Sequence, residues 1–303
     1  MHLTLQQLKL FQAVYSHSSY TRAAKSLHLT QPAVSIQVKR LETQVGLPLF
    51  DQVGKKIFPT EAGKAMYQAA LDILNRINEA RNTIEMLKGE IKGNLQISAV
   101  TTSKYFMPHL LGQFLTNYAD VEPKMVFTNR AKVLERLYNN EDDFVVMGQT
   151  PKDSHFISSP FLENILIPVV HPEHPLAKKK NLKLEDLVNV RFLEREQGSG
   201  TRLVLGRLLQ EKGLKMEPYM ELGSIEAIKQ GVMAKLGVAV LSLHALRLEL
   251  AANKMVILDV EGFPVKRRWY AVHLKGKKLP LVAQTFLDYI LMEGKNILSS
   301  SLK

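Results

Sequence analysis

The sequence predicts two kinds of fold in one chain: a small all-α N-terminal domain with a long linker helix, and then a larger α/β domain with two lobes. Three observations predict this division. Short helical patterns separated by turn signals fill residues 1–60, apolar residues recur at three- and four-residue steps through 61–92, and strand-like segments alternate with helix-like segments across 93–303. The 303 residues are 46% hydrophobic, which is enough for two or three separate cores.

Charge and composition narrow the class of partner. The net charge of +11 favours an anionic partner, but basicity alone does not separate nucleic acid from a membrane surface or an acidic metabolite. Residues 1–60 carry seven Lys or Arg against two acids, so phosphate contacts are expected there. The absence of cysteine excludes disulfides, thiolate zinc sites and cysteine nucleophiles. The N-terminus lacks a signal-peptide pattern and no apolar stretch is long enough for a bilayer, so a soluble cytoplasmic protein without a membrane partner is expected.

Three helices are expected in the first 45 residues. Thr4 and Gln7 have the spacing of a capping box at the start of the first helix. Ser19 can cap a second short helix that ends near residue 27. Thr30 can cap a third helix, in which Pro32 occupies a first-turn position where no intrahelical N–H bond is lost. The order is therefore helix, helix, turn, helix.

The third helix has two different faces. One is an apolar stripe formed by Val34, Val38, Leu41 and Val45, and the other carries Pro32, Ser35, Ile36 and Lys39. The stripe is predicted to dock on the domain. The free face fits the major groove of DNA, where Gln31 and Ser35 can reach base edges. Lys39 and Arg40 can bind phosphates.

A hairpin is expected after this helix, with Gly54, Lys55 and Lys56 at its tip as a basic wing beside the duplex. An ordinary three-helix bundle with a solvated polar face is the alternative that periodicity leaves open. The segment AAKSLHLTQPAVSIQVKRLETQVGLPLF, followed by PTEAG, resembles the winged helix-turn-helix of LysR-type transcriptional regulators. This resemblance implies double-stranded promoter DNA as partner and assigns the recognition-helix and wing positions to Gln31, Pro32, Ser35, Ile36, Lys39, Arg40, Lys55 and Lys56. Gln52 departs from the family, many of whose members have Arg there.

The linker helix is predicted to dimerise. Its apolar residues fall on the a and d positions of a coiled coil, namely Ala70, Ile73, Ile77, Ala80, Ile84, Leu87 and Ile91. A second chain is expected to cover this seam, and the alternative is packing against the helix's own domain. Two recognition helices on a twofold axis would read an inverted repeat. The family resemblance implies a homotetramer built as a dimer of homodimers.

The alternating segments after residue 93 predict a parallel or mixed sheet with covering helices. Two rounds of this pattern suggest a first lobe from 93–166 and 268–303 and a second lobe from 167–267, with a cleft between them. The region resembles the periplasmic-binding-protein-like effector domain of the same family. That resemblance implies a hinge near 165–169 and 263–268.

Ligand contacts are expected where strands end and helices begin. Residues 101–104 follow the first strand and precede a helix expected near 104, residues 129 and 130 end the second strand, and 148 and 149 follow the third. A flexible polar loop at 197–202 enters another helix. The candidate contacts are Thr101, Thr102, Ser103, Lys104, Asn129, Arg130, Gly148, Gln149, Gln197, Ser199, Thr201, Arg202 and, more weakly, Glu226. Helix capping without any ligand is the competing interpretation of these hydroxyls.

The sequence argues against catalysis. Gly198-Ser199-Gly200 lacks the spacing of a nucleophile elbow, and the loop lacks the Lys-Ser/Thr of a P-loop. A metal at His171 and His174 is disfavoured, because two prolines indicate a turn and no third ligand follows. No general acid-base pair is identified by spacing, and no cofactor is expected. The basic runs 178–180 and 266–268 are interpreted as solvated loops or as part of the hinge.

Within the family, segments such as VTTSKYFMPHLLGQF, REQGSGTR and LDVEGFPVKRRWY resemble the regulators that control RuBisCO operons. This resemblance implies a phosphorylated or dinucleotide effector and RNA polymerase as a further partner. Whether Arg130, Arg195 or Arg202 holds a phosphate is left open. The alternatives are a regulator of another metabolic operon, a nonspecific DNA-coating protein, and a small-molecule-binding metabolic protein with an incidental helical domain.

Overall fold

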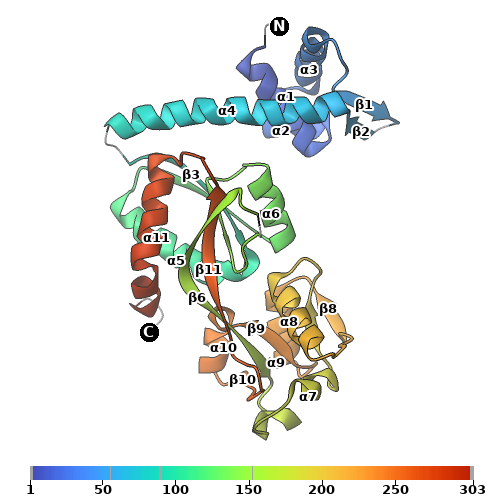
Figure 1. The fold of residues 1–303 in the computed structure, drawn as a ribbon, viewed down its shortest axis with the longest axis vertical. Helices are drawn as coiled ribbons and strands as arrows, with labels where there is room; N and C mark the ends of the chain where they lie inside the picture. Colours follow the sequence, from blue (N-terminus) through green and yellow to red (C-terminus); the bar gives the residue numbers. More distant parts are fainter. Residues whose placement is uncertain (1–2, 55, 89–90, 152, 301–303) are drawn as a thin grey trace. The chain divides into compact units, whose positions relative to one another are not determined.

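The computed structural model describes residues 3–54, 56–88, 91–151 and 153–300. The chain forms two compact units, residues 1–89 and 90–303 (Figure 1). In the described part of the chain, no helix combines the length and apolar character needed to cross a membrane.

The N-terminal unit contains the expected helices and hairpin. Its elements are α1 (Leu5–His17), α2 (Tyr20–Ser26), α3 (Gln31–Val45), β1 (Phe50–Val53), β2 (Lys56–Pro59) and α4 (Glu61–Lys88). The capping box at Thr4 is confirmed, because Thr4 Oγ1 accepts from the Gln7 N–H at 3.2 Å and the Gln7 side chain accepts from the Thr4 N–H at 3.0 Å. Ser19 caps α2 as expected. Thr30 is the N-cap residue of α3, but the predicted side-chain capping bond is wrong: its side chain makes none.

The apolar stripe of α3 is buried in the core of this unit, where Val34, Val38 and Leu41 are fully enclosed against α1 and α2. Glu42 joins α3 to the hairpin, since its Oε1 accepts from the backbone N–H groups of Leu49 and Phe50 at 2.8 and 3.3 Å. The stripe and this carboxylate fix the helix, so its opposite face is held outward.

The start of α4 belongs to the same core. Tyr67, Ala70, Leu71 and Leu74 are buried there. Ala70 was predicted to lie in a seam covered by a second chain, and this is wrong because the domain's own core covers it. Ile73, Ile77 and Ile84 are 39, 40 and 57% exposed. The side chain of Leu87 lies outside the described residues. Ile91, also predicted in the seam, follows the end of α4 and packs in the C-terminal unit instead.

The C-terminal unit is built on one sheet with the order β10-β6-β11-β5-β3-β4, in which β9 also pairs with β6. Its strands are β3 (Gly93–Val100), β4 (Val121–Thr128), β5 (Phe144–Met147), β6 (Phe156–Val170), β9 (Ala239–Ser242), β10 (Val256–Ile257) and β11 (Val265–Leu274). β3 is parallel to β4 and β5, whereas β11 is antiparallel to β6 and pairs with it along the whole length of β11. These two long strands run through both lobes (Figure 1).

Helices cover both faces of the sheet in the first lobe. They are α5 (Met107–Asn117), α6 (Arg130–Tyr138) and α11 (Leu281–Ser300), preceded by a 3-10 turn, η1 (Thr101–Tyr105). Side chains alternate along β5: Phe144 and Val146 join the core under α5 and α11, and Val145 and Met147 join the core under α6. The expected mixed sheet with covering helices is therefore confirmed.

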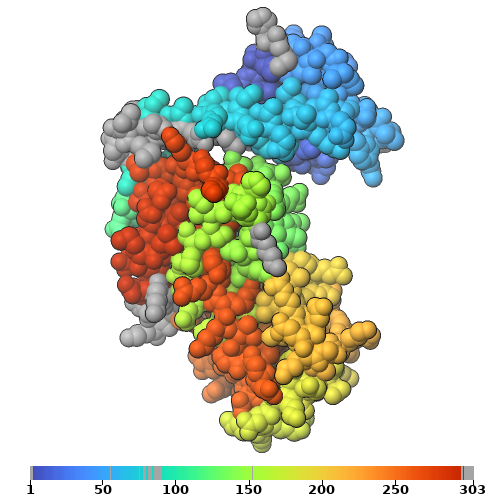
Figure 2. Space-filling view, in the orientation of Figure 1, coloured from blue at the N-terminus to red at the C-terminus, as the bar shows by residue number. Residues whose placement is uncertain are grey.

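The second lobe has separate cores formed by its own helices and short strands. These elements are η2 (Pro175–Lys178), α7 (Leu184–Val188), β7 (Leu193–Arg195), α8 (Gly200–Glu211), β8 (Met220–Leu222), α9 (Ile225–Met233), η3 (Leu243–Ala245) and α10 (Arg247–Ala251). The yellow segment around α8 lies against the green segment around α6 of the first lobe (Figure 2). There a Cβ on Gly198 would come within 3.2 Å of the Ala131 Cβ.

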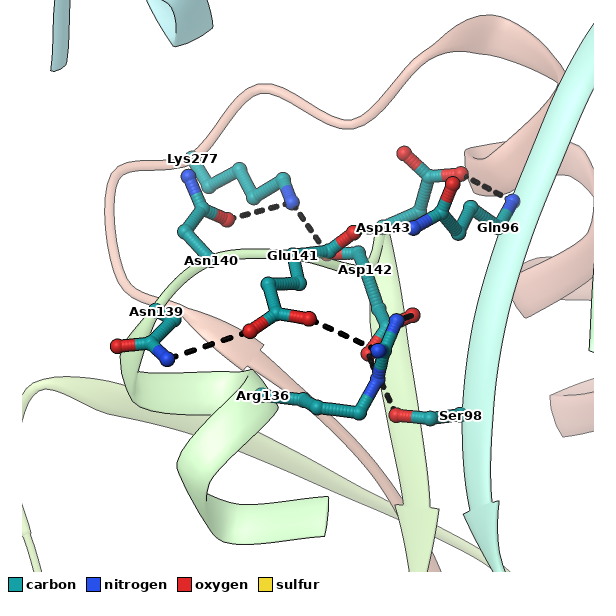
Figure 3. A network of polar contacts seen from close by, with 9 residues as sticks. All are labelled: Gln96, Ser98, Arg136, Asn139, Asn140, Glu141, Asp142, Asp143 and Lys277. Carbon is teal, nitrogen blue, oxygen red and sulfur yellow. Dashed lines mark hydrogen bonds and ion pairs between the residues drawn. The ribbon is translucent and has the colours of Figure 1, made fainter. Parts of the chain in front are cut away.

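A buried polar network holds the far end of α6 (Figure 3). Arg136 donates to both oxygens of Asp142, at 2.9 and 2.7 Å, and Ser98 on β3 donates to the same carboxylate at 2.5 Å. Lys277 donates to the Asp142 carbonyl at 2.6 Å. Because a buried carboxylate is tolerated only when it is paired, this network fixes α6, and with it Arg130 at the opposite end of the helix.

Candidate nucleic-acid interface and ligand pocket

The outward face of α3 carries the side chains predicted to touch DNA. Exposed residues of this face are Gln31, Pro32, Ile36, Lys39 and Arg40, while Ser35 is half-buried. Lys56 is exposed at the start of β2, next to the turn in which Gly54 has a φ of +62°. Lys55 lies outside the described residues. Since the opposite face of α3 is buried, these side chains are available to a partner as large as a duplex.

The charges of this face are partly balanced. Lys39 Nζ lies 3.6 Å from Glu42, but its side chain remains 81% exposed. Burial, and then the charge of Glu42, raise the pKa of Tyr20 to about 12, so this tyrosine is neutral. The Thr30 side chain makes no capping bond to the first turn of α3, and free N–H groups at a helix start favour a phosphate.

The candidate ligand pocket lies in the C-terminal unit, between the two lobes. It is lined by Val100, Thr101, Thr102, Asn129, Arg130, Gly148, Gln149, Asn164, Leu166, Arg195, Ser199, Gly200, Thr201, Ser242, Arg267 and Trp269. Eight of these were predicted from the sequence: Thr101, Thr102, Asn129, Arg130, Gly148, Gln149, Ser199 and Thr201. They come from η1, the N-termini of α6 and α8, and the end of β5, as expected for ligands of an open α/β sheet.

Local geometry differs from the sequence prediction at two of these elements. Residues 101–104 belong to η1, and the helix expected near 104 begins only at Met107. Asn129 does not end the strand but caps α6, where its Oδ1 accepts from the Lys132 N–H at 3.0 Å.

Five predicted contacts do not line the pocket: Ser103, Lys104, Gln197, Arg202 and Glu226. Ser103 is buried, and its hydroxyl donates to the Val100 carbonyl at 2.7 Å. Arg202 is held by Glu194 at 3.0 Å and also by Glu221. Gln197 is exposed in the loop before α8.

Lys104 and Glu226 instead form a second contact between the lobes. Glu226 accepts from the Tyr105 hydroxyl and lies 3.2 Å from Lys229 and 3.6 Å from Lys104. Lys229 is buried and is also paired with Glu249 at 2.7 Å. These groups therefore satisfy one another outside the pocket.

Sequence reasoning missed the part of the pocket formed by the two long strands. Asn164 on β6 is buried and accepts from the Ser242 hydroxyl at 3.1 Å. Arg267 on β11 donates to the carbonyl of Gly148. A Cβ on Gly148 would lie 2.6 Å from Asn164 Nδ2, so glycine permits this close approach. Residues 265–269 belong to β11, where exposure alternates with the strand period and Arg267 is turned inward between exposed Lys266 and Arg268, so the basic run 266–268 is not a solvated loop.

The pocket is electropositive, because three arginines line it and none of its lining residues is acidic. Arg195 is neutralised by Glu196, at 2.7 and 2.8 Å, and also donates to Thr101 at 3.2 Å across the lobes. Burial, followed by repulsion from Arg207 and Arg130, lowers the pKa of Arg267 to about 10. Burial and Arg207 also lower the pKa of Arg130. Such an arrangement favours an anionic ligand.

The free volume of the pocket is about 30 Å³, which is room for a few waters. Among the described residues, no group of three or more His, Cys, Asp or Glu is placed to hold a metal. His171 and His174 each accept a backbone N–H within their own turn.

Both parts of the chain match known protein families. Residues 5–64 match the bacterial regulatory helix-turn-helix proteins of the lysR family, and residues 88–295 match the LysR substrate binding domain. The RuBisCO operon transcriptional regulator of Acidithiobacillus ferrooxidans is 44% identical over 289 residues, which cover 95% of this chain and 94% of that protein. The HTH-type transcriptional activator CmpR of Synechocystis is 44% identical over 287 residues, again 95% and 94% of the two chains.

A solved structure resembles the C-terminal unit. It is the regulatory domain of Synechocystis CcmR in complex with 2-PG, with a TM-score of 0.65 and 41% sequence identity. The similarity covers 68% of this chain and 99% of that chain.

Proposed function

Because this chain belongs to the LysR family of bacterial helix-turn-helix regulators, we propose that it controls genes of CO2 fixation in response to a small anionic metabolite. It is a DNA-binding transcriptional regulator and not an enzyme. The observation that carries the effector part of the proposal is the pocket between the lobes. Arginine side chains line this pocket and no Asp or Glu does, so it favours an anionic ligand. The choice of genes rests on the relatives, two of which are named as regulators of the RuBisCO operon.

The proposed DNA contacts follow from the outward face of α3. Gln31 and Ser35 lie near its N-terminus and present short donors and acceptors to base edges in the major groove. Lys39 and Arg40, together with Lys56 at the hairpin, bind backbone phosphates, which fixes the register without reading sequence. Pro32 and Ile36 are proposed to supply apolar contacts on the same face of α3. Lys55 is proposed as a second wing contact.

The proposed effector carries a phosphate. The hydroxyls of Thr101, Thr102 and Thr201 and the N-termini of α6 and α8 surround the arginines, and this combination suits phosphate oxygens. A phosphorylated metabolite or a dinucleotide fits this chemistry. The 2-PG named for the Synechocystis relative supports a small phosphorylated compound here.

The proposed domain division is 1–60 for DNA binding, 61–92 for dimerisation and 93–303 for the effector, with lobes at 93–166 plus 268–303 and at 167–267. We propose that exposed Ile73, Ile77 and Ile84 on α4 are covered by a second copy. A homodimer, or a homotetramer of two dimers, then presents two α3 helices to an inverted repeat.

The effector acts by shifting a conformational equilibrium. A ligand changes DNA binding only if it binds one arrangement of the lobes better than another. Closure of the cleft around the anion would alter the spacing and bending of bound DNA, and RNA polymerase is recruited or released as a result.

A gel-shift assay tests the proposal. The protein is titrated onto the region upstream of the neighbouring divergent gene and onto random DNA at matched salt, with and without 2-PG, and with and without sugar phosphates. Preferential promoter binding, with footprints or bend angles that change when a metabolite is added, is expected. Equal binding to both DNAs would indicate a nonspecific DNA-coating protein. Footprints and bend angles unchanged by every metabolite would exclude the effector mechanism.

A further inference from the structure

Three arginines from different elements lie at one side of the pocket: Arg130 and Arg267 line it, and Arg207, which is exposed, reaches it through Gln149. Arg130 is the first residue of α6, Arg267 lies on the hinge strand β11, and Arg207 lies on α8 of the second lobe. Arg267 donates to the Gly148 carbonyl. When the Gln149 amide oxygen faces Arg207, it lies 2.7 and 3.0 Å from the two terminal nitrogens of that guanidinium. We refer to Arg130, Arg207 and Arg267 as the arginine cluster.

The arginine cluster differs from the other arginines nearby in its lack of acidic partners. Arg195 is paired with Glu196, and Arg202 is paired with Glu194 and Glu221. For the arginine cluster the described residues supply no ion pair, and its hydrogen bonds go to the neutral groups of Gly148 and Gln149.

Two further features show that this charge is uncompensated. The Nε of Arg130 is buried and has no hydrogen-bond partner among the described residues. The charge of Arg207 is one cause of the lowered pKa of both Arg130 and Arg267. Because Arg130 and Arg267 are half-buried, their repulsion with the exposed Arg207 raises the free energy of the arrangement that brings the three together.

The arrangement that brings them together is the contact between the lobes. Arg207 belongs to the second lobe, whereas Arg130 and Gln149 belong to the first. The N-terminus of α8 lies against the N-terminus of α6, where a Cβ on Gly200 would lie 3.6 Å from the Arg130 Cδ. Opening the cleft would carry Arg207 away from Arg130.

We propose that Arg207 makes closure of the cleft depend on the charge of the effector: the arginine cluster opposes closure until a ligand with two anionic groups lies between the lobes. This inference rests on the proposed function and names the charge that the effector carries. One phosphate supplies roughly 1.5 to 2 negative charges at neutral pH, which leaves part of the cluster uncompensated. A second phosphate or a carboxylate on the same molecule completes the balance. Arg207 is thus a specificity-determining residue that acts only in the closed arrangement.

The test compares two variants of the full-length protein that each remove one positive charge from α8. Arg207→Gln alters the arginine cluster. Lys212→Gln, the matched control, removes the charge of the α8 C-cap residue, whose Nζ lies 3.8 Å from the Glu261 carboxylate. Titration calorimetry measures affinity for 2-phosphoglycolate, inorganic phosphate and glycolate, and thermal unfolding is recorded without any of them.

Arg207→Gln is expected to bind 2-phosphoglycolate about tenfold more weakly, which corresponds to ~1.4 kcal/mol, while its weak affinity for glycolate changes little. Without ligand it should unfold at the same or a higher temperature than the wild type, because repulsion is removed. A residue with a merely structural role would lower that temperature. Lys212→Gln should match the wild type in both measurements.

The measurements distinguish failure of the proposed role of Arg207 from failure of the proposed effector class. If the wild type binds 2-phosphoglycolate and both variants lose the same affinity for all three anions, bulk charge explains the data and the role of Arg207 is wrong. A lower unfolding temperature for Arg207→Gln without ligand also overturns it. If the wild type binds none of the three anions, the proposed effector class is wrong. The proposed promoter binding is tested separately, by the gel-shift assay.

Discussion

The Tyr105 hydroxyl, at the end of η1 in the first lobe, donates a hydrogen bond to the Glu226 carboxylate on α9 of the second lobe. The Tyr105 ring also packs at the edge of a second-lobe core, and Lys229 Nζ lies 4.8 Å from the ring centroid. The Glu226 carboxylate receives donors from both lobes. This contact favours the closed cleft, in opposition to the arginine cluster on the pocket side.

Tyr105→Phe is expected to destabilise the closed arrangement of the effector unit by about 1 kcal/mol, because one hydrogen bond to a charged acceptor is lost while the ring packing is kept. Urea unfolding measures this change, and X-ray scattering follows the accompanying expansion. Tyr138→Phe is the matched control, since its hydroxyl lies 3.5 Å from Asp153 at an exposed site. A loss of the same size in both variants would remove the special role of Tyr105.

The effector unit is expected to lose stability below neutral pH, and His244 is one cause. Burial lowers the pKa of His244 below its ordinary value, the hydrogen bond to the Glu163 carbonyl opposes this shift, and the charge of Arg247 adds to it. The unfolded chain takes up a proton near pH 6.5, whereas the folded chain does so only at lower pH. The stabilising contribution is therefore complete above about pH 6.5 and is lost as the pH falls through the folded pKa.

Urea unfolding at pH 7.5 and pH 5.5 checks this expectation. His244→Gln should show a smaller difference in unfolding free energy between the two values than the wild type, because Gln keeps a donor near Glu163 but does not titrate. His109→Gln, which removes an exposed imidazole on α5, serves as the control. An unchanged difference in His244→Gln would assign the pH dependence to other groups.

Ser35→Ala is expected to weaken promoter binding by about 1 kcal/mol or more and to leave random-DNA binding nearly unchanged, because base contacts carry sequence discrimination. Lys39→Gln should weaken binding to both DNAs and reduce the slope of log affinity against log salt by about one. Gel shifts at several salt concentrations measure both effects. Equal losses for Ser35→Ala on promoter and random DNA would argue against base readout by this residue.

The sequence predicted the N-terminal unit closely because its signals are local. A capping box, the cap at Ser19 and the stripe from Val34 to Leu41 each lie within a few residues, and each is found in the structure. The missing capping bond of Thr30 shows the limit of such patterns, since the residue type and its extended backbone fit the N-cap position but the side chain makes no capping bond.

The ligand pocket was predicted only in part because one side of it depends on pairing between distant strands. Helix N-termini and strand ends identified Asn129, Arg130 and Ser199 from local signals. Asn164 and Arg267 enter the pocket through the register of β6 with β11, in which Arg267 pairs with Asn164 across about a hundred residues of sequence. Nothing near Arg202 in the sequence indicated that Glu194 and Glu221 would hold it away from the pocket.

The exposed isoleucines of α4 lead to a prediction about assembly. Ile73 and Ile77 lie one turn apart, before and after Leu74, and remain 39 and 40% exposed, whereas Leu74 is buried in the unit's core. An apolar row of this kind on a long charged helix is stable in water only when another surface covers it.

Ile77→Asp is therefore expected to shift the protein from homo-oligomer to monomer by placing a charge in the covered seam, with little change in the thermal unfolding of the helix-turn-helix core. Sedimentation velocity over a range of concentrations measures the shift. Gln68→Asp introduces the same charge at an exposed position on the same helix and should leave the oligomer intact. Because each monomer presents a single α3, promoter affinity of Ile77→Asp should fall by tenfold or more through loss of the second half-site contact. Retention of the oligomer by Ile77→Asp would show that this face of α4 is not the interface.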